Sequence, residues 1–103
     1  MLNVSVLENP AITLKLSIQR ALVGEVTHRL HSVTCGLRRH VITVRAYFFE
    51  AVTPGDVERI QLVCAQVIAD FPEGYLIEEE CRSLNEGDPE TLDFWGFQRA
   101  DES

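Results

Sequence analysis

Residues 41–71 read VITVRAYFFEAVTPGDVERIQLVCAQVIADF, a strand pattern followed closely by a helix pattern. Alternating β-branched and aromatic residues in the range 41–50 predict a strand with two different faces. A helix is expected to begin at 53–56, where Thr53 can cap the first amides and Pro54 suits the first helical position. One face of this helix is apolar at the spacing of an amphipathic helix: Val57, Ile60, Val63, Cys64, Val67, Ile68 and Phe71.

A strand is also expected directly before this stretch. Between Leu30 and Leu37 the apolar residues alternate with polar ones, which is strand spacing. The sequence Arg38-Arg39-His40 would form the turn into the next strand. It lacks the Asn-Gly pair that is typical of tight hairpins, so the sequence leaves the geometry of this turn open.

A first helix is expected from Asn9-Pro10, since Asn caps free amides and Pro is tolerated at the first helical position. Its end is expected at Gly24, which can adopt the left-handed conformation. The alternation at 14–18 also fits a strand, but the helix-forming residues that follow favour a helix. The buried positions of this helix would be Leu14, Ile18, Ala21 and Leu22.

A third strand is expected after the long helix, at residues 75–84. Its alternation separates one face with Tyr75, Ile77, Glu79 and Cys81 from another with Leu76, Glu78, Glu80 and Arg82. Turn-forming residues predict a loop at 85–89, and the aromatic residues beyond it would form a short last strand at 94–99.

The expected order of elements in residues 1–103 is therefore helix, strand, strand, helix, strand, strand. Residues 85–103 would form a C-terminal strand or tail. Hairpins and helices that are segregated in this way favour a single α+β domain. We expect an antiparallel sheet of three to four strands with two helices on one face.

Charge is distributed unevenly along the chain. The 103 residues contain 9 Lys+Arg against 16 Asp+Glu, a formal net charge of −7 at pH 7. Residues 1–49 hold six bases and two acids, whereas residues 50–103 hold three bases and 14 acids. General nucleic-acid binding is disfavoured because it needs cations that face phosphates. The chain also lacks an apolar run of the roughly 20 residues that cross a bilayer.

An acidic field attracts and retains a basic partner, so the acidic segment is the candidate binding surface. Adjacent glutamates are unfavourable in a strand, and the nearby aromatic residues are typical of interfaces. The competing interpretation is a solvated face that only keeps the protein soluble. The candidate partner-binding residues are Glu73, Glu78, Glu79, Glu80, Glu86, Asp88, Glu90, Asp93 and Trp95.

No catalytic, metal or cofactor site is predicted from the sequence, and the protein is not expected to be an enzyme. His28 and His31 are three residues apart, but they fall at a helix-to-strand junction without a set of further ligands. The cysteines at positions 35, 64 and 81 form no Cys-x-x-Cys motif and are expected to be buried in a reducing compartment.

Four stretches resemble a group of small bacterial proteins: Arg20–Thr27, Ala46–Glu50, Val67–Pro72 and Ile77–Glu80. This group is similar to the immunity proteins of contact-dependent growth inhibition and other polymorphic toxin systems, and the similarity covers residues 19–84. The resemblance implies a protein that binds a cognate toxin. Many such toxins are nucleases with basic surfaces, which a small acidic protein can occlude.

The resemblance and the charge together predict an immunity protein whose partner is a basic toxin domain, namely a nuclease. It would act in the cytoplasm, since the first residues lack the basic region and apolar core of a secretory signal. Direct contact with nucleic acid or membrane is not expected. The alternative is a small non-catalytic homodimer with a housekeeping or regulatory role, associating through Tyr47 and Phe49 on an exposed sheet face.

Overall fold

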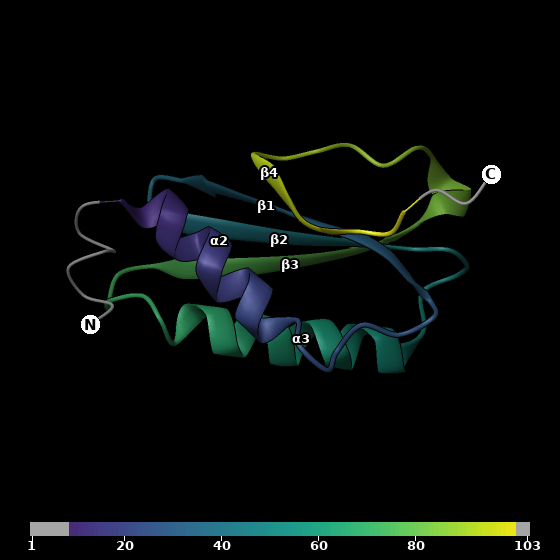
Figure 1. Cartoon of the computed structure of the whole chain (residues 1–103), viewed down its shortest axis with the longest axis horizontal. Coiled ribbons are helices and arrows are strands. Elements are labelled where there is room, and N and C mark those ends of the chain that lie inside the picture. Colours follow the sequence, from purple (N-terminus) through teal and green to yellow (C-terminus); the bar gives the residue numbers. More distant parts are fainter. Residues whose placement is uncertain (1–8, 101–103) are drawn as a thin grey trace.

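The structure is a computed structural model that describes residues 9–100, so the first eight residues and the end of the expected tail lie outside it. Its elements follow the predicted order, with a helix where the sequence also allowed a strand (Figure 1). They are α2 (Pro10–Ala21), β1 (Leu30–Arg38), β2 (Val41–Phe48), α3 (Pro54–Ile68), β3 (Leu76–Ser83), the 3-10 helix η1 (Leu84–Glu86) and β4 (Phe94–Gln98).

Both α-helices begin where the sequence predicts, because capping side chains satisfy their first amides. The side chain of Asn9 accepts a hydrogen bond from the Ile12 amide at 3.2 Å. Thr53 and Asp56 form a capping box, in which each side chain accepts a hydrogen bond from the other residue's amide, at 3.2 and 3.0 Å. The Asp56 carboxylate also accepts hydrogen bonds from Arg29, which ties the start of α3 to the loop before β1.

The sheet has the strand order β3-β2-β1-β4 and is mixed, so the expected purely antiparallel sheet is wrong. β1 pairs antiparallel with β2 and β4, whereas β2 and β3 run parallel. The physical reason is the connection through α3, because a helix that crosses over between two neighbouring strands returns the chain to the end where the first strand began. Alternation could not reveal this, since its period is the same in both kinds of sheet.

Both α-helices pack against one face of the sheet. α3 contacts β3, and α2 contacts α3 and β4; Figure 1 shows α2 crossing α3 obliquely. Gly96 in β4 allows the close approach of α2, because a Cβ there would lie 3.2 Å from the Ile18 side chain. The buried core between the layers confirms the predicted apolar faces and includes Leu14, Ile18, Val33, Cys35, Ile42, Val44, Ala46, Phe48, Ile60, Val63 and Val67.

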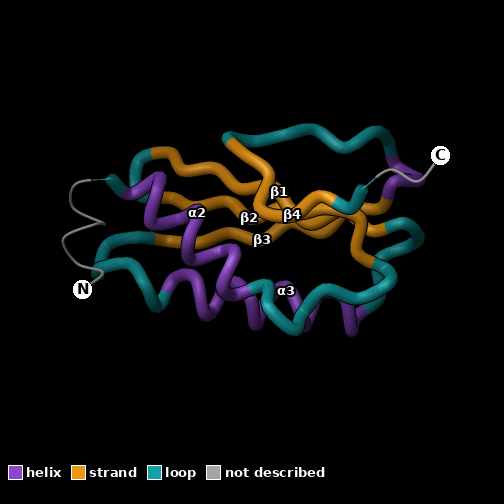
Figure 2. Tube along the Cα trace, in the orientation of Figure 1, coloured by secondary structure: helices purple, strands orange, loops and turns teal. Residues whose placement is uncertain are grey.

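We call the opposite side of the sheet the outer face. The register of the strands places on it Ser32, Thr34, Gly36, Arg38, Val41, Thr43, Arg45, Tyr47, Leu76, Glu78, Glu80, Arg82 and Trp95. Residues 87–93, the covering segment, run back between η1 and β4 on the side away from α3 (Figure 2). The hydroxyl of Thr34 accepts a hydrogen bond from the Leu92 amide at 2.8 Å and donates one to the Phe94 carbonyl at 2.7 Å.

Tyr47 also lies beneath this segment. Its hydroxyl accepts a hydrogen bond from the Glu90 amide at 2.9 Å and is 3.2 Å from the Glu90 carbonyl, to which it can donate. Tyr47 is therefore only 3% exposed, and the expectation that it forms an accessible dimer face is wrong. Phe49 is 40% exposed but follows the end of β2.

The β1–β2 turn, whose geometry the sequence left open, is a two-residue hairpin. Its central residues Arg39 and His40 both have positive φ, at 49° and 68°. This is the backbone of a type I′ turn, which matches the twist of the strands but normally selects Asn and Gly. The His40 ring stacks on Tyr75 at 4.4 Å, and the His40 carbonyl accepts a hydrogen bond from the Leu76 amide at 2.9 Å, which fixes the start of β3.

Candidate functional site

The predicted acidic residues do not form a single cluster. Glu73 and Glu78 lie near the start of β3, beside the β1–β2 turn, whereas Glu86 and Asp88 follow the end of β3. Figure 1 shows these two ends of the strand. β3 has eight residues, and at roughly 3.3 Å per residue its ends are about 23 Å apart. The structure therefore separates the predicted surface into two groups at opposite ends of the sheet.

Two arginines of the same chain hold Glu80 in place on the outer face. Its Oε1 atom accepts hydrogen bonds from Arg45 Nε at 2.6 Å and from Arg82 Nη2 at 3.5 Å. The Arg45 side chain is only 13% exposed, so the Glu80 carboxylate neutralises a cation that water reaches poorly. The strand register explains this glutamate on the outer face, because it places Glu80 beside Arg45.

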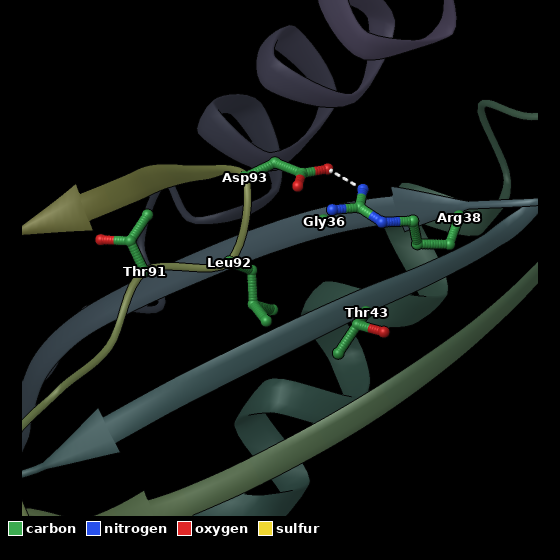
Figure 3. Close-up of a pocket in the computed structure, with 6 residues that line it drawn as sticks. All are labelled: Gly36, Arg38, Thr43, Thr91, Leu92 and Asp93. Carbon is green, nitrogen blue, oxygen red and sulfur yellow. Dashed lines mark hydrogen bonds and ion pairs between the residues drawn. The ribbon is translucent and has the colours of Figure 1, made fainter.

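Asp93 also has a structural role, at the rim of a shallow hollow on the outer face (Figure 3). Its Oδ2 atom accepts hydrogen bonds from the Arg38 guanidinium and the Leu37 amide, both at 2.9 Å. These two bonds hold the pKa of Asp93 below its ordinary value. The hollow has a volume of about 300 Å³ and is lined by Gly36, Arg38, Thr43, Thr91, Leu92 and Asp93.

Glu79 lies on the helix-facing side of β3, as the alternation predicts, and is half-buried. The charge of Glu79 adds to the effect of burial in raising the pKa of the Cys64 and Cys81 thiols. Burial raises the pKa of Cys35 and Cys64 to about 12 and that of Cys81 to about 11. These thiols stay protonated at neutral pH and are poor nucleophiles. Cys35 and Cys64 are buried as expected, whereas Cys81 is only half-buried.

The histidines that could have formed a metal pair do not lie on one helix. His31 belongs to β1, where its Nδ1 atom is 2.9 Å from the Ser32 hydroxyl and its ring packs edge-on against Phe49 at 5.2 Å. In residues 9–100, no three His, Cys, Asp or Glu side chains are grouped to hold a metal ion. Within the same range, no helix has both the length and the apolar character to cross a membrane.

Trp95 is half-buried on the outer face, in register with Thr34 and with its ring 6.4 Å from that of Tyr47. It therefore rests against the sheet beside the covering segment. Glu90 is fixed by its backbone to Tyr47, while its residue as a whole remains exposed. Of the two, only Glu90 presents an exposed side to a partner.

Ion pairs use most of the cations of the protein. Six of the nine Lys and Arg residues pair with carboxylates, and several pairs join the basic N-terminal half to the acidic C-terminal half. Sequence alone could not show this, because Arg38 and Asp93 are 55 positions apart. Within the described residues, the acids that form no ion pair are Glu50, Glu58, Glu73, Glu78, Glu79, Glu86, Asp88 and Glu90.

Leu76 is an exposed residue that the sequence reasoning did not select. It lies on the outer face beside Val41 and is 64% exposed. The alternation had already placed Leu76 on the charged face of β3, with Glu78 and Glu80. An apolar residue on a charged face was the signal that could have identified it.

Comparison with known protein families identifies the family of this chain. Residues 11–101 match the MafI2 immunity protein family. None of the curated proteins that were compared with the chain matches it. The family match confirms the resemblance to immunity proteins of polymorphic toxin systems, while the link to contact-dependent growth inhibition stays a prediction. The chain belongs to the MafI2 immunity protein family and is an immunity protein whose partner is a cognate toxin.

Proposed function

We propose that the protein neutralises its cognate toxin by direct binding, without chemistry of its own, and that this toxin is a nuclease. The observation that carries the proposal is that six cations pair with acids of the same chain, which leaves an excess of unpaired acids among the described residues. A nuclease needs cations to hold the phosphates of its substrate. An acidic protein is complementary to such a surface and can occlude it.

In this mechanism the immunity protein competes with nucleic acid for the toxin and does not contact nucleic acid itself. Inhibition needs an interface of standard size, about 800 Å² on each partner. The acidic field speeds encounter with a basic surface, while close contacts set the lifetime of the complex. The protein would act in the cytoplasm, where a nuclease toxin meets its substrate.

Fewer residues are suited to this interface than the sequence suggests. Glu80 and Asp93 already neutralise arginines of the same chain, so they have little charge to offer. Glu79 and Trp95 are half-buried. The acidic residues proposed to attract the toxin are the exposed ones, Glu73, Glu78, Glu86, Asp88 and Glu90.

The proposal is tested by capture and inhibition. The tagged protein is used to isolate its partner from the native host, and the partner is identified by mass spectrometry. The captured domain is then incubated with plasmid DNA and with RNA, with and without the immunity protein. We expect a basic domain that degrades one of these substrates and stops doing so when the immunity protein is added. A captured toxin that leaves both substrates intact contradicts the nuclease assignment.

A further inference from the structure

The strand register arranges the outer face in rows of three residues, one from each of β1, β2 and β3. The row nearest the β1–β2 turn contains Val41, with Arg38 and Leu76 on either side. The next row contains Thr43, with Gly36 and Glu78 on either side. Gly36 is buried beneath Leu92 and Asp93 of the covering segment. The other five residues, here called the open patch, form a continuous surface at one end of the sheet.

Contacts within the chain occupy most of the remaining two rows. In the third row Thr34 is fully buried beneath the covering segment, and Arg45 is paired with Glu80. In the fourth row Tyr47 is buried beneath Glu90. Arg82, at the end of the fourth row, remains 46% exposed and pairs with Glu80. The open patch is therefore the apolar part of the outer face that the chain leaves uncovered.

The chemistry of the open patch is apolar with one uncompensated negative charge. Leu76 is 64% exposed beside Val41, and the hollow that Thr43 and Leu92 help to line borders the patch (Figure 3). The charge of Arg38 is neutralised by Asp93. Glu78 is exposed and forms no ion pair with any described residue.

The turn that borders the patch supplies an independent observation. Arg39 and His40 both adopt left-handed backbone conformations, at φ 49° and 68°, although neither is Gly or Asn. Such conformations cost bulky residues energy and are concentrated at functional sites. Here the strained turn lies at the edge of the open patch, with His40 stacked on Tyr75.

We infer that the toxin docks on the open patch through a segment that carries an apolar side chain flanked by a lysine or arginine. The apolar side chain contacts Leu76 and Val41, and the cation pairs with Glu78. This inference rests on the proposed function and names the surface that performs it. It makes the acids near η1, such as Glu86 and Asp88, contributors to the electrostatic field and not to the contact.

The test compares two matched double variants for binding to the captured toxin domain. The first is Leu76→Ala with Glu78→Gln on the open patch. The control is Leu62→Ala with Glu58→Gln, which removes a leucine that is 56% exposed and an exposed glutamate from α3, on the opposite side of the sheet. Thermal unfolding is measured for both variants as a control. Both should remain folded, because the substituted positions are exposed.

We expect the open-patch variant to bind the toxin domain at least about tenfold more weakly, because central apolar and charged contacts dominate interfaces. The control should bind within about threefold of the original protein. Equal binding by both variants overturns the inference while the proposed function stands. Failure of the unaltered protein to bind any toxin overturns both.

A second measurement does not depend on the variants. Hydrogen–deuterium exchange of the protein with and without the toxin domain should show slower exchange at residues 41–43 and 76–78 in the complex. Protection confined to residues 84–90 would place the toxin at the opposite end and overturn the inference. A dimer in sedimentation that the Leu76→Ala, Glu78→Gln variant abolishes would also overturn it, because a second copy would then occupy the patch.

Discussion

The hydroxyl of Tyr47 fastens the covering segment to the sheet through both backbone groups of Glu90. Tyr47→Phe removes these hydrogen bonds and leaves two backbone groups without their partner. We expect the free energy of unfolding to fall by about 1–2 kcal/mol. Amides at 88–92 should exchange faster in hydrogen–deuterium exchange, while those of β2 should not. Unchanged exchange at 88–92 would show that other contacts hold the segment.

Asp56 links stability to pH. Burial alone would raise the pKa of Asp56, but hydrogen bonds from Arg29 and Thr53 outweigh it and lower the pKa below 3.8. A lowered pKa in the folded state adds stability that is fully present above the unfolded value and is lost as the pH falls through the folded value. Stability should therefore decline below about pH 4.

The variant Asp56→Asn should lose this dependence on pH and about 1.5–3 kcal/mol at pH 7, because hydrogen bonds to a charged group are replaced by neutral ones. Urea unfolding at several pH values between 2 and 7 measures both effects. Glu58→Gln is the control on the same helix, since Glu58 is exposed and forms no ion pair among the described residues. Identical pH profiles for the original protein and Asp56→Asn would refute this assignment.

Glu80 and Glu78 should behave differently although they lie two residues apart on the same face of β3. Glu80→Gln deprives the poorly exposed Arg45 of its partner and should lower the free energy of unfolding by about 1–2 kcal/mol. Glu78→Gln should change it by less than about 0.5 kcal/mol. Chemical denaturation of both variants measures the difference, and equal effects would contradict the division into structural and exposed acids.

At the scale of single elements, the β1–β2 hairpin contains stored strain. Arg39 has positive φ, and its side chain is exposed. Arg39→Asn replaces a bulky residue by one that tolerates the left-handed region and keeps the stacking of His40 on Tyr75. We expect a gain of about 0.5–1 kcal/mol, seen as an increase of several degrees in the thermal midpoint. A lower midpoint would mean that the turn is not strained.

The helices and strands themselves could be predicted because their signals are local. Asn9 and Thr53 mark helix starts by capping, and the apolar faces follow from periodicity alone. The parallel pairing of β2 with β3 could not be predicted, since alternation carries no information on strand direction. The burial of Tyr47 could not be predicted either, because it depends on Glu90, which is 43 positions away in the sequence.

The candidate site was predictable in composition but not in arrangement. The sequence identifies which residues are acidic and that the protein has an acidic half. It cannot show that Glu80 and Asp93 are held by arginines of the basic half, because these pairs form only when distant strands come together. It also cannot show that the covering segment reaches Thr34 and Tyr47 but leaves Leu76 exposed.

At the scale of the whole molecule, the net charge of −7 should control the rate at which the protein associates with the toxin. Reversing two acids at the η1 end, Glu86→Lys with Asp88→Lys, reduces the field without touching the open patch. We expect a slower association rate at low salt and an almost unchanged dissociation rate. Stopped-flow measurements at several ionic strengths test this. A faster dissociation rate would place these acids in the contact itself.

The most direct test of the central claim is a titration of the nuclease activity proposed for the toxin with the immunity protein. If inhibition is binding alone, activity should fall in proportion to the amount added and vanish near one molecule of immunity protein per toxin. It should return when the two proteins are separated. Lasting inactivation by an amount well below that of the toxin would reveal catalysis by the immunity protein, and undiminished nuclease activity at an excess would contradict inhibition by occlusion.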